Sequence, residues 1–560
     1  MKREWQIAKV DRAKALSLAR ALNVPPLIAH VLLARGINTI ETAKRFLNPA
    51  IEHIGDPFLF NEMEKAVERV NIAIQRNENV LIFGDYDVDG VSGTALLVKA
   101  FRRLGLQRCQ YDVPNRFTEG FGLSPSRVRR AHQEGVTLII TVDNGSSAQD
   151  AADEAKKLGI DLIVTDHHPT KEPLSNVTAF LNSACEPSSH VSANACGVGI
   201  AYKLAWALTG EPADLDLVAL GTVADVVPLQ GENRDFVAVG LQWAAREAKP
   251  GIDALARVSG LALEKLRSED IAYHLAPRIN AAGRLSSAHK ALDLLLTDSP
   301  SDALRLAREL DEANEERKRL ETAILEEASE MLVKELEQGK KAVVLGSRSW
   351  HPGVAGIVAA RIQTRYGVPA IIVVFGEDGL GRGSARGVDG INLAEVLAQC
   401  EEYLVTYGGH KAAAGVTIRE EALDKFRDRF EEAVAVAMPG KPSPAPLSID
   451  AVISLSEIEG KLIRAIEKLA PFGHGNPMPV FLCQGVRVLK NSLKELRNDS
   501  IRFVVQDGPR LFPAVGFRLG DRAREIASAD KIDVAFSLQI DSWRGESTVQ
   551  LRIRDFRVLP

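Results

Sequence analysis

The chain has 560 residues, of which 46% are apolar and 26% are charged. This composition excludes a disordered chain and a small disulfide-stapled scaffold, and the length predicts roughly three or four domains. The five cysteines form no C-x-x-C pair and have no histidine at zinc spacing, which excludes a zinc finger. The opening MKREWQIAKV has no apolar signal core, and no run approaches about eighteen apolar residues, so we expect a cytoplasmic protein with no membrane span.

The net charge of −5 is distributed unevenly along the chain. Residues 471–560 contain 14 Lys and Arg against 10 Asp and Glu, which gives +4, so the first 470 residues together carry −9. A basic C-terminal segment beside an acidic body is consistent with an enzyme that acts on a polyanion.

Residues 1–48 are expected to form a helical lead-in, because Pro25 and Pro26 favour a helix start and Gly36 a helix end. In residues 49–230, apolar strands alternate with helical patterns. The strands are expected at 80–83, 110–113, 138–142 and 162–164. This alternation predicts an α/β fold with a parallel sheet covered by helices.

Acidic residues follow three of these strands. They are Asp85, Asp87 and Asp89 in GDYDVDG, Asp143 in VDNG, and Asp166 before His167 and His168, with Asp225 in GTVADVVPL as a further candidate. The first three alternate at period two, so in an extended conformation they would share one side of the strand end. Carboxylates gathered at one edge of a sheet repel one another unless a cation compensates. The sequence therefore predicts a Mn²⁺ or Mg²⁺ site with enough carboxylates for two ions.

Two alternatives apply to the first acidic stretch. The pattern D-x-D-x-D-G opens an EF-hand loop, but Leu96 stands where the bidentate glutamate is required, and a strand rather than a helix precedes Asp85. The other alternative is a solvated acidic turn. Three successive acidic strand ends with adjacent histidines favour the metal site over such a turn.

Beyond Asp225 the spacing of apolar residues predicts a helical region, a second α/β unit, a linker and a barrel. Residues 231–340 are expected to be helical, with one long amphipathic connector helix over about 301–339, and residues 341–438 to form a second α/β unit. Residues 439–446 are a proline-rich linker. In residues 447–560, five short strands separated by turn signals predict an OB-type barrel.

Two further clusters are candidate binding sites. Gly408, Gly409 and His410 are interpreted as a glycine-rich turn whose N–H groups can bind phosphate, and Ser384 and Arg386 add an anion-binding hydroxyl and guanidinium. In the barrel, aromatic and basic side chains interleave as a single-strand groove requires, although part of the aromatics must face the core. The groove candidates are Arg502, Phe503, Phe517, Arg518, Trp543 and Arg552.

Several motifs of the chain resemble those of the DHH phosphoesterase superfamily and, within it, the RecJ family of single-strand-specific exonucleases. They are GDYDVDG, VDNG, the DHH at 166–168, PNRFTEGFGL, PRINAAGRL, HPGVAGI, GRGSARG, GGHKAAAG and PFGHGNP. The resemblance runs nearly end to end. It implies a parallel-sheet DHH domain at 49–230, a DHH-associated substrate domain at 341–438 and an OB-fold single-strand-binding domain at 447–560.

The resemblance also implies roles for individual residues. The metal ligands would be Asp85, Asp87, Asp143, His167 and Asp225, with Asp143 bridging two ions. Asp89 and Asp166 would orient these ligands, and His168 would contact the scissile phosphate or protonate the leaving oxygen, or else only hydrogen-bond a ligand. Substrate contacts are implied for Arg116, Arg278, Asn280, Arg284, His351, Ser384, Arg386 and His410, of which Arg116, Ser384 and Arg386 would hold the 5′ end.

The implied activity is hydrolysis of single-stranded DNA from the 5′ end to mononucleotides, in DNA repair and recombination. The implied partners are single-strand-binding protein and a helicase, and a monomer is expected. Two rivals are a small-substrate phosphoesterase of the same superfamily, such as an oligoribonuclease or cyclic-dinucleotide phosphodiesterase, and a strand-binding scaffold without catalysis. The first lacks the lead-in and the barrel. The second is disfavoured because every carboxylate of the pattern is present.

Overall fold

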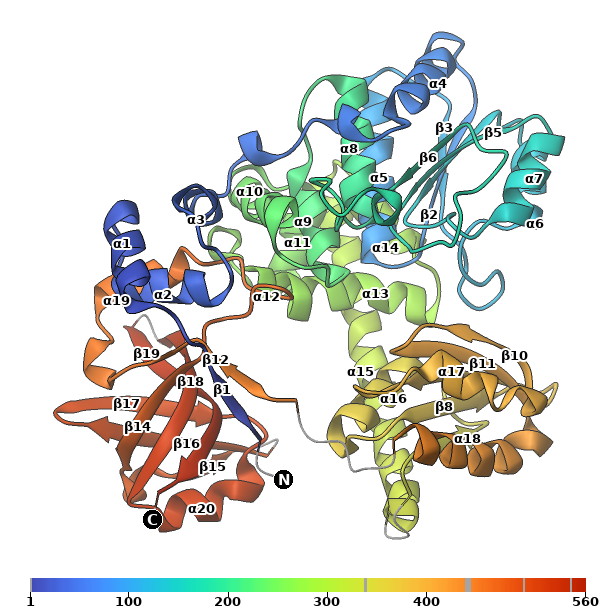
Figure 1. The fold of residues 1–560 in the computed structure, drawn as a ribbon. Helices are drawn as coiled ribbons and strands as arrows, with labels where there is room; N and C mark the ends of the chain where they lie inside the picture. The colour runs from blue at the N-terminus through green and yellow to red at the C-terminus, as the bar shows by residue number, and fades with distance from the viewer. Residues whose placement is uncertain (1–2, 337–339, 439–444, 497–498, 544–545, 560) are drawn as a thin grey trace.

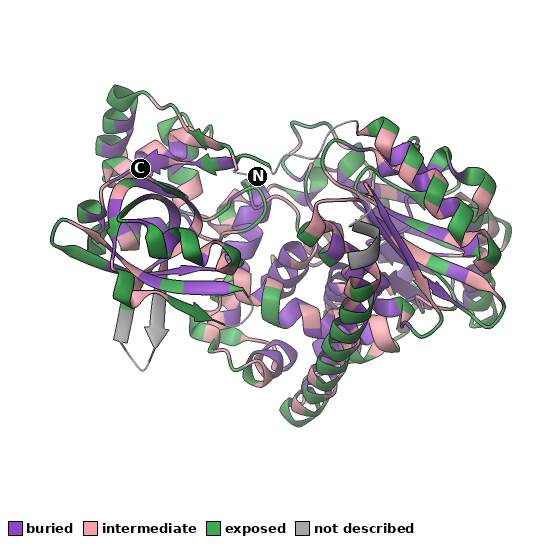
Figure 2. Cartoon of the chain, turned by 90° about the horizontal axis from the view of Figure 1, so that it is seen from below, coloured by how far each residue is buried: buried purple, intermediate pink, exposed green. Residues whose placement is uncertain are grey.

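The structure is a computed structural model that describes residues 3–336, 340–438, 445–496, 499–543 and 546–559, apart from the side chains of 333–336, 540–543 and 546–547. The structure contains two α/β units, which one long helix connects, and a β barrel (Figure 1). Exposed residues lie on the outer faces of the covering helices, whereas most strands of the α/β sheets are buried (Figure 2).

The first sheet has five parallel strands in the order β3-β2-β4-β5-β6, which confirms the predicted parallel sheet and adds a fifth strand to the four expected ones. The strands are β2 (Val80–Gly84), β3 (Cys109–Asp112), β4 (Leu138–Val142), β5 (Asp161–Asp166) and β6 (Ala179–Asn182). Strands β2 and β4 are apolar and buried along their whole length, because helices cover both faces of a parallel sheet.

Two sets of helices cover this sheet. One face packs against α4 (Met63–Gln75), α5 (Val88–Arg103) and α8 (Gly197–Thr209), and the other against α6 (Pro125–Gln133) and α7 (Gln149–Lys157). Helix α9 (Leu215–Ala224) packs against α5 and α8. The loops that leave the carboxyl ends of the strands therefore lie at one edge of a rigid layered body.

A helical region follows, and its last helix connects two bodies. It contains α10 (Gly231–Glu247), α11 (Pro250–Val258), α13 (Ala276–Leu285), α14 (His289–Leu296) and α15 (Pro300–Leu336). Helix α15 has 37 residues, which confirms the predicted long helix. Its Leu306 and Leu310 lie in the core of the first unit, whereas Ile324 and Leu332 lie in the core of the second. The two α/β units thus share one continuous helix.

The second unit is a mixed five-stranded sheet in the order β10-β11-β9-β8-β7. Its elements are β7 (Val343–Ser347), α16 (Pro352–Tyr366), β8 (Ala370–Phe375), β9 (Leu380–Arg386), α17 (Leu393–Ala398), β10 (Leu404–Gly409), β11 (Ala413–Arg419) and α18 (Leu423–Ala437). Gly408 and Gly409 are the last residues of β10 and pair with Gly415 and Ala414. Interpreting the two glycines as a turn is therefore wrong, since the turn begins at His410.

The C-terminal unit is a closed barrel of five strands. Each barrel strand pairs with the next in the order β14-β18-β19-β17-β16, and pairing of β14 with β16 closes the ring. The five are β14 (Phe481–Val488), β16 (Ser500–Asp507), β17 (Arg510–Gly516), β18 (Lys531–Trp543) and β19 (Glu546–Val558). They match the five predicted strands and the OB-type barrel. Of the predicted linker, residues 439–444 lie outside the described part.

The lead-in differs from the prediction. It begins with a strand, β1 (Trp5–Ile7), which pairs in parallel with β12 (Leu447–Ile449), and only then continues as α1 (Arg12–Leu22), α2 (Pro26–Ala34) and α3 (Ile40–Leu47). Ile28 and Leu32 share a core with Phe481 and Phe503 of the barrel. The lead-in therefore packs against the C-terminal unit, and Trp5 of β1 pairs with Leu447, which lies 447 − 5 = 442 residues later in the sequence. The three residues of β1 give no strand signal without this partner.

Among the described helices, none is by itself long and apolar enough to cross a membrane, and α1 and α2 pass that test only as a pair bent by 116°.

Candidate metal centre

Acidic side chains from four segments meet at the carboxyl edge of the first sheet. Asp85 follows β2, Asp143 follows β4, Asp166 ends β5 and Asp225 directly follows α9. Asp85, Asp143 and Asp166 are buried. They converge because neighbouring parallel strands end at the same edge of the sheet.

Asp87 and Asp89 reach this edge from the start of helix α5 and not from an extended strand. Asp87 is the N-cap of α5, and its Oδ1 accepts hydrogen bonds from the backbone N–H of Asp89 and Gly90 at 2.9 and 3.3 Å. Asp89 accepts from the N–H groups of Gly197 and Val198 at the start of α8, at 2.7 and 2.9 Å. The period-two extended arrangement is therefore wrong, although the three side chains still share one edge.

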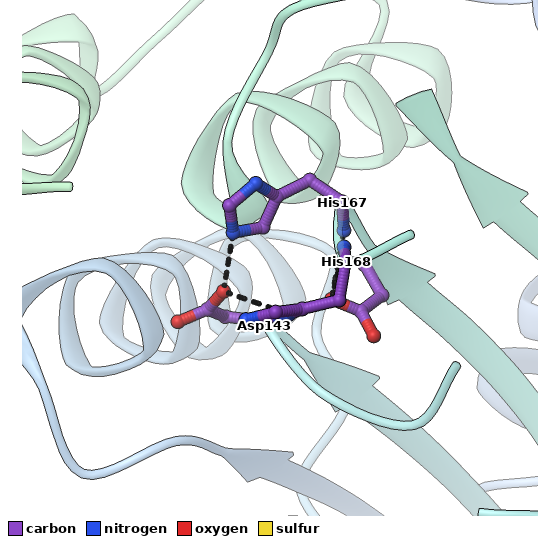
Figure 3. Close-up of side chains that lie close together, drawn as sticks. Asp143, His167 and His168 are labelled. Carbon is purple, nitrogen blue, oxygen red and sulfur yellow. Dashed lines mark hydrogen bonds and ion pairs between the residues drawn. The ribbon is translucent and has the colours of Figure 1, made fainter. Parts of the chain in front are cut away.

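Asp143 and His167 form the centre of the cluster. His167 Nε2 lies 3.0 Å from Asp143 Oδ1, 3.6 Å from Asp225 Oδ2 and 3.8 Å from Asp89 Oδ2. Figure 3 shows the His167 ring directed at the Asp143 carboxylate. Asp143 has a φ of 61°, and a Cβ on residue 197 would stand 2.5 Å from the Asp143 Cβ, so this close approach of α8 requires Gly197.

Burial and mutual repulsion dominate the electrostatics of the cluster. Burial together with the neighbouring carboxylates raises the pKa of Asp85 and of Asp143 well above the usual value, and raises the pKa of Asp225 to about 8. Burial also lowers the pKa of His167, which favours the neutral imidazole that binds metals. Negative charge at this site is unfavourable unless a cation balances it.

The residues present fit divalent cations. Within the described residues, Asp85 Oδ1, Asp143 Oδ1 and His167 Nε2 are buried atoms without a hydrogen-bond partner, although the last two are only 3.0 Å apart. Three groups have ligand atoms within 4.8 Å of one another. They are Asp85 with Asp87 and Asp143; Asp89 with His167 and Asp225; and Asp143 with Asp166, His167 and His168. Asp143 belongs to two of the three groups, and oxygen donors with one imidazole suit Mn²⁺ or Mg²⁺.

His168 is held by Asp166 beside this cluster. Asp166 Oδ1 lies 2.8 Å from His168 Nδ1, and Asp166 Oδ2 accepts from the N–H of Ser146 at 2.9 Å. Burial, which disfavours the imidazolium, is outweighed by the bond to Asp166, so the pKa of His168 is raised. The Nε2 side of the ring remains available to donate a proton.

A basic flank lies beside the acidic cluster. The Arg116 guanidinium stacks 4.1 Å from the centre of the Tyr86 ring. Burial and the nearby Arg116 lower the pKa of Arg284 to about 10. Arg278 is already engaged, since its Nε donates to Asp311 of α15 at 2.9 Å, and Asn280 is half-buried on α13. Arg284 Nη1 donates to the Gly353 carbonyl at 3.4 Å, and the charges of Arg116 and Arg284 act on Asp85 and Asp87 of the cluster.

The second unit contributes polar groups from α16 and β9. His351 is the N-cap of α16, with its Nδ1 accepting from the Gly353 N–H at 3.1 Å. Ser384 and Arg386 face Gly356 of the same helix, where an added Cβ would lie 3.3 and 3.1 Å from their polar atoms. His410 is exposed at the tip beyond β10.

Three family models match the chain. They are the DHH family N-terminal domain over residues 79–222, the DHHA1 domain over 338–436 and the RecJ OB domain over 449–555. The single-stranded-DNA-specific exonuclease RecJ of Bacillus subtilis is 35% identical over all of this chain and 71% of that protein. That of Escherichia coli is 32% identical over 99% of both chains. The chain belongs to the RecJ family.

Solved RecJ structures agree in fold. The crystal structure of RecJ from Thermus thermophilus in complex with Mn²⁺ matches with a TM-score of 0.85 and 30% identity, over 100% of this chain and 80% of that chain. The structure of the same protein in complex with Mg²⁺ matches with a TM-score of 0.79 and 28% identity, over 100% and 79%. The Thermus thermophilus protein is thus in complex with the two ions that the acidic cluster of this chain fits.

Several residues that sequence reasoning missed also line this RecJ site. The Phe121 ring is 57% exposed and lies 5.5 Å from the His168 ring, and Tyr86 flanks it at 6.5 Å. Arg382 of β9 donates to the Phe117 carbonyl at 2.8 Å and so joins the two α/β units. Phe117 and Phe121 belong to the motif PNRFTEGFGL, and this motif was the signal that could have pointed to them. The sequence of a loop does not show which residues its aromatic side chains contact.

In the barrel, some of the predicted groove residues are exposed and one is buried in the core. The prediction is wrong for Phe503, which is fully buried in the barrel core. Phe517 is 52% exposed, and the Arg552 guanidinium lies 5.3 Å from its ring centre. Arg502 pairs with Val515 and Val515 with Arg552, so the two arginines lie in one row across three strands, and Arg518 is exposed beside them. The Trp543 side chain lies outside the described part.

Proposed function

We propose that this chain is a divalent-metal-dependent exonuclease that hydrolyses single-stranded DNA. One observation carries the proposal: Asp143 Oδ1 and His167 Nε2 are buried atoms 3.0 Å apart that have no hydrogen-bond partner among the described residues, and other carboxylates surround them. Such atoms are stable only with a cation between them. The proposal is supported by the 35% identity to a single-stranded-DNA-specific exonuclease over the full chain.

The proposed ligands hold one or two Mn²⁺ or Mg²⁺ ions. They are Asp85, Asp87, Asp143, His167 and Asp225, with Asp143 shared. When bound, such ions would activate a water and balance the charge on the scissile phosphate. Asp89 keeps α8 against the site through its two backbone hydrogen bonds, which holds Gly197 against Asp143.

His168 is proposed to move the proton that the leaving oxygen requires. Asp166 accepts from Nδ1, which leaves Nε2 as the atom that delivers the proton. The alternative, that His168 only hydrogen-bonds the phosphate, predicts that His168→Gln retains most activity.

The basic groups are proposed to position the strand. Arg116 and Arg284 would bind phosphates next to the metal site. Ser384 and Arg386 would hold the terminal phosphate, so that hydrolysis of the strand starts at its 5′ end. Further residues are proposed to line the path of the DNA strand between these groups. They are His351, Gly408, Gly409, His410, Arg278 and Asn280. Arg502, Phe517, Arg518 and Arg552 would bind the strand on the barrel by stacking and charge.

The experiment compares oligonucleotides labelled at the 5′ or the 3′ end in Mn²⁺. Early release of a labelled mononucleotide from the 5′-labelled strand, with slow shortening of the 3′-labelled one, is expected. Release from the 3′ end would contradict the polarity, and no metal-dependent release from either strand would contradict the enzyme.

The wider role is proposed from family likeness. The chain is proposed to act as a cytoplasmic monomer in DNA repair and recombination, with single-strand-binding protein and a helicase as partners. The proposed units are 1–48, 49–230, 231–340, 341–438 and 447–560, joined before the last by the linker 439–446. Light scattering tests the monomer, and affinity capture with purified single-strand-binding protein tests the first partner.

A further inference from the structure

The turn that follows the proposed metal ligand Asp225 has a strained backbone. Helix α9 ends at Ala224, Asp225 is still helical, and Val226 has a φ of 62°. A β-branched residue at positive φ is rare, because its side chain collides with its own backbone. The Val226 side chain is also 62% exposed, so burial of that side chain does not compensate for the strain.

A loop of the C-terminal segment holds this turn. This loop is residues 473–476 of the PFGHGNP motif, and its His474 carbonyl accepts from the Leu229 N–H at 2.8 Å. Its Gly475 carbonyl accepts from Gln230 Nε2 at 2.7 Å. Gly475 itself has a φ of 71°, and a Cβ there would stand 2.9 Å from the Pro228 Cβ. The loop and the turn are therefore in direct contact, with no room for a side chain between them.

The loop is itself fixed. The fully buried guanidinium of Arg234 donates to the carbonyls of Leu469 and Ala470 at 3.0 and 2.6 Å, and it stacks 3.8 Å from the Phe46 ring centre. Asn476 Nδ2 donates to the carbonyls of Leu469 and Pro471 at 2.9 and 2.8 Å. The loop can therefore resist displacement when it presses on the turn.

We propose that loop 473–476 is a positioning element of the metal site. It holds the strained turn at Val226 and thereby keeps the Asp225 carboxylate directed at His167, whose Nε2 is 3.6 Å away. The C-terminal segment would then complete the catalytic centre in addition to binding DNA. This inference rests on the proposed metal-dependent function, because it assigns a support to one of the proposed ligands.

The test is Gly475→Ala in the full chain, with Gly508→Ala as its matched control. Both glycines have positive φ, but Gly508 lies in the β16–β17 turn with nothing within 4 Å of an added Cβ. We expect Gly475→Ala to weaken Mn²⁺ binding, measured by calorimetry without DNA, by about 10–100-fold, as losing a ligand's support does. Amide hydrogen exchange at residues 226–230 should accelerate, while Gly508→Ala leaves both measurements unchanged.

A rescue separates positioning from simple packing. Glycine adopts positive φ without strain, so with Val226→Gly the turn no longer needs the loop to hold its conformation. Val226→Gly should therefore restore most Mn²⁺ affinity in the Gly475→Ala background. If Gly475→Ala does not fold, Gln230→Ala, which removes only the side-chain bond to the loop, should weaken Mn²⁺ binding several-fold. Unchanged affinity in the folded variants, or a failed rescue, would overturn the inference. Absence of Mn²⁺ binding by the wild type would instead overturn the proposed function.

Discussion

Asp143 is the residue on which most constraints of the site act. It has a positive φ of 61°, is buried beneath α8 and shares its Oδ1 environment with His167. Its carboxylate lies where burial and repulsion by Asp89, Asp87 and Asp85 all raise its pKa. Such an arrangement of charged groups lowers the free energy of unfolding in the absence of a cation.

Asp143→Asn is therefore expected to have opposite effects on activity and stability. Mn²⁺-dependent nucleotide release should fall by more than about 100-fold, since losing only a supporting residue costs up to that much. In EDTA the thermal midpoint should rise, because an acid whose pKa is raised on folding destabilises the folded state at every pH above its unfolded pKa. Calorimetry and an end-label assay measure the two effects. The exposed Asp150→Asn should change neither, and a lower midpoint for Asp143→Asn would contradict the repulsion.

Phe503 and Phe517 are expected to behave differently although both were groove candidates. Phe503→Ala should destabilise the barrel by about 3–5 kcal/mol, because it leaves a cavity in the core. Phe517→Ala should leave stability nearly unchanged and weaken single-strand binding by about 1–3 kcal/mol, the range for one stacked base. Chemical denaturation and fluorescence anisotropy distinguish them. Equal loss of stability in both variants would show that Phe517 is a core residue.

At the scale of elements, helix ends complete the site that the strand ends begin. Asp87 caps α5, Asp89 accepts from the first N–H groups of α8, and Asp225 follows the last residue of α9. The N-terminus of a helix favours negative charge, so α5 and α8 partly offset the repulsion among the carboxylates. The residual repulsion is what a bound cation would balance.

The contact between β3 and α14 is expected to make stability depend on pH. His289 Nε2 lies 2.8 Å from Asp112 Oδ1, and this hydrogen bond raises the pKa of His289. A raised histidine pKa stabilises the fold fully below the unfolded value near 6.5, and the contribution is lost as pH rises through the folded value.

His289→Gln, which keeps a hydrogen-bond donor but no charge, isolates this effect. The wild type should be more stable than the variant at pH 6, and the difference should shrink towards pH 8.5. Urea unfolding at the two pH values measures it. A difference independent of pH would mean that the contact acts by packing alone.

At the scale of the whole molecule, distant segments complete one another. The first strand, β1, pairs with β12 of the C-terminal unit. The two halves of α15 pack in the cores of two different α/β units. Arg382 joins the second unit to the Phe117 carbonyl in the loop beside the metal site. The catalytic sheet is therefore one part of a connected body.

Metal binding is expected to stabilise this body measurably. An ion that binds only the folded state at 100 times its dissociation constant adds about 2.7 kcal/mol. A thermal midpoint that rises by several degrees in Mn²⁺ and returns to its first value in EDTA is the expected result. Asp143→Asn should show no rise. A rise of the same size in that variant would place the stabilising ion elsewhere.

Much of the fold could be predicted because periodicity is local. The buried strands 80–84 and 138–142, the 37-residue helix and the five barrel strands are all determined by the spacing of apolar residues. The acidic strand ends were also found in this way, since parallel strands end together.

Only the tertiary structure decided three features. They are the pairing of β1 in the lead-in, the burial of Phe503 and the contact of loop 473–476 with the turn after Asp225. The first and the third depend on partners far away in sequence, such as β12 for β1 and Gly475 for Gln230, and the second depends on the closure of the barrel strands around Phe503. The sequence by itself determined which residue types are present for metal and phosphate chemistry, because those requirements are properties of single side chains. Which of them face the site is a property of packing, and packing is settled only when the whole chain has folded.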